Sequence, residues 1–460
     1  MKRLISITIL LLLVAVVVTV IYRFNFRKSI PAEASVPEQV VSIIQQNDCL
    51  VCHDINAEAP FYASLPVSGP WFRGHMRHAV RFVDLQRVCT AIDKINEADL
   101  AKIEQAVSNG SMPITEYKLL HWGTGFNDKE KSVLMQWIAD TRAKRFATGL
   151  AAKQFANNAI QPIISSVRVD SAKVMLGYKL YHDNRISGDN TVSCAFCHPL
   201  DKGGVDNLRT SKGIRNQFGT INAPTVYNSS LNFGQFWNGH APTLALQAAE
   251  PPLNPVEMGS NSWDEITARL RADKVLVAEF ATLYPEGITE ATVTDAIEEF
   301  EKTLLTPNCP FDRYLKGDSN ALTAEQLAGY EAFKENDCAT CHVGQGLGGQ
   351  SYEYIGITED YFASRSSEIE WTEDDEGLYG VTKDSLDLTR LKVPMLRNIA
   401  LTAPYLHDGT AGTIKAAVGV MFRYQLGLSE NDPSIPSIVT FLRTLTGENP
   451  HMQAAESSAK

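Results

Sequence analysis

The stretches Cys49–His53 (CLVCH), Cys194–His198 (CAFCH) and Cys338–His342 (CATCH) repeat one pattern, Cys-x-x-Cys-His, three times in this chain. Two thiols at this spacing can each form a thioether to one haem, and the histidine that follows them ligates the iron. One such motif lacks the four ligands of a structural zinc site, and the βαβ pattern of a thiol redox protein is absent. The sequence therefore predicts three covalently bound haem c groups. Their thioether cysteines are Cys49, Cys52, Cys194, Cys197, Cys338 and Cys341, and their iron ligands are His53, His198 and His342.

The motifs are evenly spaced, 145 and 144 positions apart, which suggests one domain-sized unit for each haem. Short sequences also recur: Gly177-Tyr178 precedes the second motif, and Gly329-Tyr330 precedes the third. Apolar residues fall on one helical face between positions 293 and 304, and no long alternating strand pattern occurs. We therefore expect a mainly α protein with three class-I cytochrome c-like haem domains. Their expected ranges are 39–150 for an N-terminal monohaem cytochrome c domain, then 165–312 and 313–448.

The N-terminus begins with Lys2 and Arg3, followed by an uncharged and mostly apolar run at residues 4–22. As a helix this run would be ~28 Å long, close to the thickness of a bilayer core, whereas a cleaved signal peptide usually has a shorter apolar stretch. We therefore expect residues 1–28 to form a transmembrane helix that anchors the chain. Because haem c is attached outside the bacterial cytoplasm, the expected location is the inner membrane, single-pass, with the bulk of the chain in the periplasm.

Net charge and the two remaining cysteines give weaker information about partners and disulfide bonds than the haem motifs give about cofactors. The formal net charge is −11, which argues against nucleic acid as a partner because no basic stripe is present to neutralise phosphates. Cys89 and Cys309 lie outside the motifs and could pair with each other or stay reduced. Buried free cysteines are common in proteins, so we expect two free, buried thiols.

The side of each iron opposite its histidine decides what that haem does. A methionine raises the reduction potential and fills the site of an electron carrier, whereas an open sixth position allows chemistry. In the first unit we predict Met112 as the second iron ligand, because it lies in a turn-like sequence, Gly110–Pro113. His75 and His78 are alternatives, and Met112 could instead pack against the haem edge.

Residues 165–448 contain further short sequences in a fixed order. They are Gly203-Gly204-Val205-Asp206, Asn222-Ala223-Pro224-Thr225, Gln235-Phe236-Trp237, Pro251-Pro252, Glu257-Met258, Pro310-Phe311-Asp312, Leu396-Arg397-Asn398, Ala400–Tyr405 and Val420-Met421. This ordered set resembles the bacterial dihaem cytochrome c peroxidases. The additional N-terminal unit, with Met112-Pro113 and His121-Trp122, is similar to that of the trihaem, membrane-bound quinol peroxidases.

The resemblance implies different roles for the second and third haems. The haem at His198, in residues 165–312, would be the peroxidatic one. The haem at His342, in residues 313–448, would transfer electrons and would take Met421 as its second iron ligand. Trp237 would lie between the two haems. Without the resemblance, Met421 and Trp237 could simply be core residues.

The resemblance also implies a peroxide pocket and a calcium site. Gln247 and Glu257 would line the pocket, and the prolines at positions 251, 252 and 255 would hold the approach to Glu257 rigid. A calcium ion between the two haem domains would be bound by Asn222 and by the carbonyls of Thr402 and Pro404. Taken alone, Glu257 could be a surface carboxylate and Asn222 a turn residue.

The sequence departs from the family pattern at two positions. Many dihaem members have a histidine after the first motif that caps the peroxidatic iron until the partner haem is reduced. Ile214 stands there and cannot ligate iron, so we expect an iron site that is open without reductive activation. His240 stands where the family usually has arginine, and it could swing in as a ligand, tune the pocket or bind a propionate.

Together these observations predict a trihaem peroxidase that reduces hydrogen peroxide to water. Electrons from membrane quinol would pass through the first and third haems to the second. A soluble cytochrome c or a small copper protein is the alternative donor, and a non-enzymatic trihaem electron carrier is the alternative function. Relatives that oxidise tryptophan residues of a partner protein lack the methionine found here as Met421, which disfavours that activity.

Overall fold

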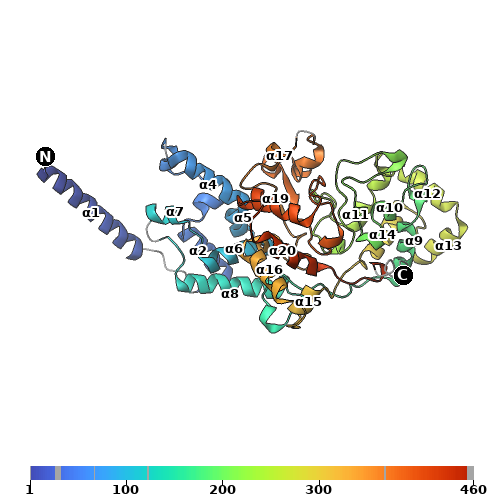
Figure 1. Cartoon of the computed structure of the whole chain (residues 1–460), viewed down its shortest axis with the longest axis horizontal. Coiled ribbons are helices and arrows are strands. Elements are labelled where there is room, and N and C mark those ends of the chain that lie inside the picture. The colour runs from blue at the N-terminus through green and yellow to red at the C-terminus, as the bar shows by residue number, and fades with distance from the viewer. Residues whose placement is uncertain (1, 26–32, 67, 122–123, 367–368, 453–460) are drawn as a thin grey trace. The chain divides into compact units, whose positions relative to one another are not determined.

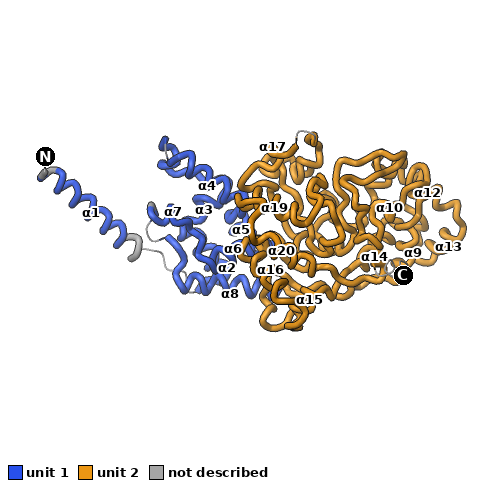
Figure 2. The backbone as a smooth tube through the Cα atoms, viewed as in Figure 1, with its two compact units in different colours: residues 1–145 blue, residues 146–460 orange. Residues whose placement is uncertain are grey.

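The fold was obtained as a computed structural model, which describes residues 2–25, 33–66, 68–121, 124–366 and 369–452. The chain forms two compact units, Met1–Arg145 and Phe146–Lys460 (Figure 2). The first unit contains the first haem motif, and the second unit contains the other two.

Helices dominate both units, as the sequence predicts (Figure 1). Among the described residues the only sheet is a two-stranded antiparallel ribbon, in which β1 (Tyr352–Tyr354) pairs with β2 (Arg390–Lys392). The expectation of a mainly α protein is confirmed. The finer expectation of three cytochrome c-like domains stays a prediction, since the chain forms two compact units.

The first unit contains eight α-helices within the described residues. They are α1 (Lys2–Asn25), α2 (Val36–Gln46), α3 (Leu50–His53), α4 (Ser68–Phe82), α5 (Leu85–Thr90), α6 (Glu97–Asn109), α7 (Thr115–Leu120) and α8 (Asp128–Arg145). The side chain of Asn96 accepts a hydrogen bond from the Asp99 N–H and caps the start of α6. A buried ion pair of 2.7 Å between Arg142 and Glu97 joins α8 to α6.

The predicted membrane anchor is corrected by the structure. Crossing a bilayer takes about 20 consecutive apolar residues in a helix. Across the residues that the structure describes, no helix is both long enough and apolar enough to do so. On this finding, the prediction of a single-pass protein of the bacterial inner membrane, anchored through residues 1–28, is wrong.

The second unit contains both of the later haem motifs. Its described α-helices are α9 (Ser171–Tyr181), α10 (Cys194–Cys197), α11 (Leu244–Ala248), α12 (Trp263–Arg271), α13 (Lys274–Leu283), α14 (Glu290–Glu301), α15 (Pro310–Leu315), α16 (Ala324–Glu335), α17 (Tyr361–Ser364), α18 (Tyr379–Thr382), α19 (Ile414–Leu426) and α20 (Ile435–Leu442). Short 3-10 turns and long loops connect them, and several of the candidate site residues, such as Trp237 and Glu257, lie on these loops.

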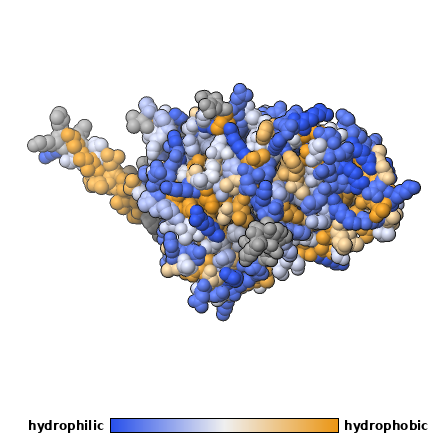
Figure 3. All heavy atoms as spheres, turned by 45° about the vertical axis from the view of Figure 1, so that its right-hand side comes forward, coloured by the Kyte–Doolittle hydropathy of each residue, from blue (hydrophilic) through white to orange (hydrophobic). Residues whose placement is uncertain are grey.

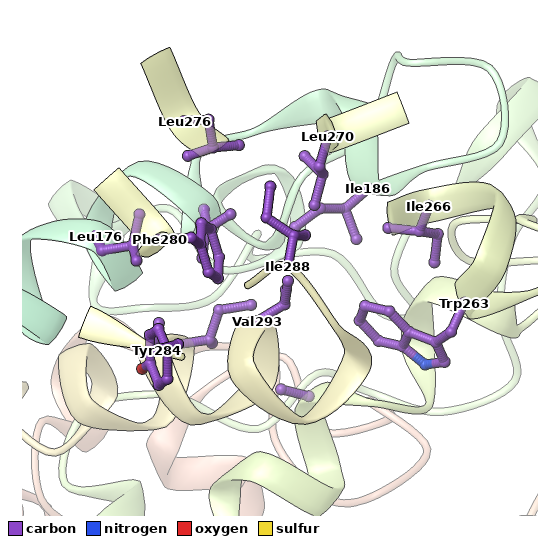
Figure 4. Packing of buried hydrophobic residues seen from close by; sticks show 14 of the residues in the cluster. Leu176, Ile186, Trp263, Ile266, Leu270, Leu276, Phe280, Tyr284, Ile288 and Val293 are labelled. Atoms are coloured by element: carbon purple, nitrogen blue, oxygen red, sulfur yellow. The ribbon is translucent and has the colours of Figure 1, made fainter. Parts of the chain in front are cut away.

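Two apolar clusters form most of the core of the second unit. One lies among α9, α12, α13 and α14 and includes Leu180, Phe280 and Ile297, and Figure 4 shows how its side chains interlock. The other includes Phe311 and Phe441 and lies among α15, α16, α19 and α20. The face of this unit seen in Figure 3 is largely hydrophilic, in keeping with the burial of its apolar residues.

The repeated Gly-Tyr pair has a packing explanation. A Cβ added to Gly177 on α9 would lie 1.8 Å from the carbonyl oxygen of Ala296 on α14. A Cβ added to Gly329 on α16 would lie 2.1 Å from the carbonyl oxygen of Ser437 on α20. Both glycines therefore allow two helices to approach closely, one beside each of the later haem motifs.

Replacing either glycine with alanine should destabilise the second unit. Because the added methyl group meets a backbone carbonyl, we expect Gly177→Ala and Gly329→Ala each to cost about 1–3 kcal/mol in the free energy of unfolding. Denaturant unfolding followed by circular dichroism measures this. Gly74→Ala on α4 is the control, because no atom lies within 4 Å of its added Cβ. Equal stabilities for Gly177→Ala, Gly329→Ala and Gly74→Ala would contradict the packing explanation.

Candidate haem and peroxide sites

All three motif histidines make the same hydrogen bond. The Nδ1 atom of His53 lies 2.9 Å from the carbonyl oxygen of Val83, that of His198 is 3.1 Å from Gly204, and that of His342 is 3.0 Å from Leu347. A histidine that donates from Nδ1 keeps the lone pair of Nε2 for a metal, and such carbonyl partners orient haem ligands. Burial lowers the pKa of each of the three rings, which favours the neutral ligand form.

The thiols also fit covalent haem. All eight cysteines are free, and the six motif cysteines are half-buried beside their histidines. Burial raises the pKa of the Cys49 thiol to about 12 and that of the Cys52 thiol to about 11. The expectation that Cys89 and Cys309 stay unpaired is confirmed. Cys309 is buried as expected, whereas Cys89 is only half-buried, so that part of the prediction is wrong.

The structure places the candidate ligands of the first haem at different positions. Met112 follows the left-handed residue Gly110 that ends α6, and it is half-buried. His75 and His78 both lie on α4, where His75 packs against the Trp71 ring and His78 is exposed. None of these positions is tested as an iron ligand, so Met112 stays a prediction.

Sequence reasoning missed an aromatic cluster beside the first motif. The Tyr62 hydroxyl lies 2.8 Å from Nε2 of His121, whose ring stacks on Tyr117 at 4.0 Å. Cys52 packs against the same cluster. The only sequence signal was the His121-Trp122 pair, because the partners lie 59 positions apart.

Glu257 lies in a fixed and partly buried position near the second motif. Its Oε1 atom accepts a hydrogen bond of 2.8 Å from the Asn254 side chain, and its carbonyl oxygen accepts one of 2.8 Å from the Ile214 N–H. Burial raises the pKa of Glu257 to about 7, and the negative charges of Asp374 and Glu250 contribute to the rise. A carboxyl with a pKa near neutrality can both accept and release a proton at physiological pH.

Glu257 is also close to the haem attachment. Burial raises the pKa of the Cys197 thiol to about 12, and the charges of Asp206 and Glu257 add to that effect. The Glu257 carboxylate therefore interacts electrostatically with the second motif. Its role in a peroxide pocket stays a prediction.

Ile214 holds the loop at residues 211–219 against the segment that carries Glu257. Its side chain is 1% exposed and packs against Gly259, and its N–H donates to Glu257. Gly213 allows this approach, since an added Cβ there would lie 2.0 Å from the Val256 carbonyl oxygen. An aliphatic side chain buried in this way supplies no ligand atom, and the loop is fixed by backbone contacts.

The other pocket candidates, Gln247 and His240, lie close to Glu250. Gln247 is half-buried on α11. The His240 ring stacks on Phe236, and its two nitrogens lie 2.6 Å from Asn238 Oδ1 and 2.7 Å from Glu250 Oε2. His240 is therefore held at the surface by its contacts with Asn238 and Glu250, and a swing towards the iron would have to break them.

Trp237 lies between the regions that carry the second and third motifs. Its indole N–H donates to the Asn222 carbonyl at 2.9 Å, and its own carbonyl accepts from the Lys392 N–H at 2.8 Å. The Asn222 N–H donates to the His407 carbonyl at 2.7 Å, and the His407 ring meets Trp237 edge-on at 6.2 Å. The role of Trp237 as an electron relay between two haems stays a prediction.

A buried charged network adjoins Trp237, and no sequence pattern predicted it. Nε2 of His407 lies 2.8 Å from Asp375, whose two oxygens also bind Arg365 at 2.8 Å each. Although burial alone would raise the pKa of Asp375, His407 and Arg365 hold it well below the usual range. Asp375 therefore stays charged and fixes both partners.

The predicted calcium ligands lie in segments whose described contacts are hydrogen bonds within the protein. The Asn222 amide donates to the carbonyls of Leu208 and Arg209, at 3.0 and 3.2 Å. Thr402 and Pro404 lie in a loop whose neighbouring carbonyls, at positions 401 and 403, accept from Asn207. The calcium site stays a prediction, as does Met421, which is half-buried on α19.

Two family profiles match the chain. The profile of the di-haem cytochrome c peroxidase family matches residues 171–320, and that of a haem-binding domain matches residues 9–140. The chain is 45% identical to cytochrome c peroxidase Ccp of Escherichia coli K12 over 419 residues, covering 90% of this chain and 89% of that protein. It is 42% identical to cytochrome c551 peroxidase of Nitrosomonas europaea, over 64% of this chain and 86% of that one.

Solved structures also match the chain at the level of the fold. A MauG-like protein associated with microbial copper homeostasis matches with a TM-score of 0.55 and 26% identity, over 64% of this chain and 97% of that chain. The diheme peroxidase BthA of Burkholderia thailandensis matches with a TM-score of 0.52 over 61% of this chain and 87% of its own. At 20% identity, the second match concerns the fold alone.

Proposed function

The chain belongs to the di-haem cytochrome c peroxidase family and is a haem peroxidase acting on hydrogen peroxide. From this premise we propose that it works with three haems and reduces peroxide at the haem of His198. The observation that carries the assignment to His198 is Glu257. Asn254 and Ile214 fix the position of this residue, and the pKa of its carboxyl is raised. Its charge also raises the pKa of the Cys197 thiol in the second motif. Because the chain belongs to a peroxidase family, we no longer favour the alternative of a non-enzymatic electron carrier.

The proposal of a third haem rests on the first unit. Its motif has the same histidine–carbonyl hydrogen bond as the other two, made by His53 and Val83. The haem-binding domain profile covers this region, and the relative from Escherichia coli aligns over nearly the whole chain. Three equivalent ligand arrangements support three bound haems.

The chemistry consumes one peroxide, two electrons and two protons and releases two molecules of water. A bound haem supplies the iron at which the peroxide is reduced. Glu257 takes the proton from one peroxide oxygen and returns it to the other, as a general base and then an acid. Gln247 orients the peroxide by hydrogen bonding, and Trp237 carries electrons between the regions of the third and second motifs.

A quinol is the proposed electron donor, and the first haem is its point of entry. The support is the resemblance of the first unit to that of trihaem quinol peroxidases. Tyr62 and His121, hydrogen-bonded at 2.8 Å beside Cys52, add a group able to take the proton that a quinol releases on oxidation. The second candidate donor is a small soluble cytochrome, which the relative named cytochrome c551 peroxidase favours.

Steady-state turnover with two donors tests this proposal. Fully oxidised protein is mixed with peroxide and with either a reduced quinol analogue or a reduced soluble cytochrome c. We expect the quinol to support turnover without a lag, because Ile214 cannot cap the iron. We expect Cys49→Ala/Cys52→Ala, which lacks the first haem, to lose at least tenfold of this rate.

Two outcomes would contradict the proposal. Rapid turnover with the cytochrome alone would replace the quinol as donor. An unchanged quinol rate in the variant without the first haem would remove that haem from the electron path.

A further inference from the structure

An acidic turn at residues 372–377 is fixed in place by one of its carboxylates. The turn contains Thr372, Glu373, Asp374, Asp375 and Glu376. The side chain of Asp375 is 2% exposed and accepts hydrogen bonds from the Thr372 N–H, from Arg365 and from His407. A carboxylate with this many donors leaves the turn little freedom, so the neighbouring side chains occupy defined positions.

The carboxylate just before it in the chain, Asp374, contacts the region that carries the second motif. The Thr220 hydroxyl donates a hydrogen bond to Asp374 Oδ2. Thr220 directly follows the loop at residues 211–219, which contacts the Glu257 segment twice: Ile214 N–H donates to the Glu257 carbonyl, and the Gln217 amide donates to Pro255 at 3.2 Å. One loop therefore joins Asp374 to the segment that carries Glu257.

We propose that Asp374 is a positioning residue for peroxide reduction: held by Thr220, it presents a negative charge to the Glu257 pocket and so sets the pH range over which Glu257 can take a proton from peroxide. The inference rests on the proposed role of Glu257. It goes further because it assigns a function to a residue from the region of the third motif, more than a hundred positions along the chain.

The surroundings of Glu257 give this charge its effect. Besides Asp374, the groups that interact with Glu257 are the carboxylate of Glu250, the thiol of Cys197 and the amide of Asn254. Glu250 Oε2 lies 2.7 Å from Nε2 of His240, whereas the described partner of Asp374 is the hydroxyl of Thr220. After burial, Asp374 is the leading charge that raises the pKa of Glu257.

The sign of the effect follows directly. A nearby negative charge makes it harder to ionise a carboxyl, so it raises the pKa of that carboxyl. Removing the charge of Asp374 therefore lowers the pKa of Glu257, and more of the base form is present in mildly acidic solution. At the same time the protonated form, which returns the proton, becomes scarcer near neutrality.

The pH dependence of kcat/KM for peroxide tests the proposal in the complete, haem-loaded protein. We expect Asp374→Asn to move the acid limb of the profile to lower pH by roughly 0.3–1 unit, the effect of one partly screened charge. Thr220→Val, which releases Asp374 but keeps its charge, should move the limb in the same direction by less. Glu373 is an exposed carboxylate of the same turn, so Glu373→Gln should leave the limb in place.

The outcomes separate this inference from the proposed function. An acid limb that stays in place in Asp374→Asn, with all haems bound, would overturn the inference, and so would an equal shift in Glu373→Gln. If Asp374→Asn does not fold, an unmoved limb in Thr220→Val overturns it instead. Full turnover in Glu257→Gln would contradict the role of Glu257 itself, whatever Asp374 does.

Discussion

Glu257→Gln is expected to lower kcat for peroxide reduction by about 10²- to 10⁴-fold, the usual contribution of a positioned general acid and base. Glutamine has nearly the same shape and can keep a hydrogen bond with Asn254, so the pocket should stay intact. It can no longer accept a proton from one peroxide oxygen and deliver it to the other. Stopped-flow or steady-state turnover with a fixed donor measures the loss.

The controls for this prediction concern haem content and position. The absorbance of the bound haem should be unchanged, since Glu257 ligates no haem in the proposed arrangement. Glu286→Gln makes the same chemical change at an exposed position after α13 and should leave turnover within about twofold. If Glu257→Gln retained more than a tenth of the wild-type rate, proton transfer would have to be assigned to another group.

The pH dependence of the wild-type protein offers a second check on the same role. With the pKa of Glu257 raised to about 7, the base form should grow between roughly pH 6 and pH 8. The sign follows from the first step, which needs an ionised carboxylate. We expect kcat/KM for peroxide to rise over this range and the rise to disappear in Glu257→Gln.

The sequence alone predicts the parts of this protein whose chemistry needs a fixed local spacing. The three haem motifs are the clearest case, because two thioethers and one iron ligand must come from five consecutive residues. The Gly-Tyr repeat also pointed to equivalent positions beside the second and third motifs. It did not reveal the reason, which is a carbonyl oxygen on a helix more than a hundred positions away.

Features that depend on long-range contacts could not be predicted. Val83, which accepts the hydrogen bond of His53, lies 30 positions from it. Asp374 looks like part of a solvated acidic loop until Thr220, 154 positions away, is seen to bind it. The apolar run at the N-terminus shows the opposite limit, since local composition predicted a membrane span that the described helices do not provide.

The motif Leu396-Arg397-Asn398 was recognised only by resemblance, and the structure gives its arginine a physical role. Arg397 forms an ion pair of 2.9 Å with Asp312, and both side chains are 0% exposed. The guanidinium also donates to the Gln345 carbonyl at 2.7 Å, to the Gln161 carbonyl at 3.1 Å and to the Cys309 sulfur at 3.0 Å. Arg397 thus joins segments of the second unit that are far apart in the sequence.

Arg397→Met is therefore expected to destabilise the second unit by about 3–5 kcal/mol, because it leaves Asp312 buried without its positively charged partner. Denaturant unfolding of the haem-loaded protein measures the change. The double variant Arg397→Met/Asp312→Asn should recover part of the loss, since the unpaired charge is gone. Arg443→Met, which makes the same change at an exposed arginine of the second unit, should change stability by no more than about 0.5 kcal/mol. A double variant less stable than Arg397→Met would show that lost hydrogen bonds, and not the stranded charge, account for the cost.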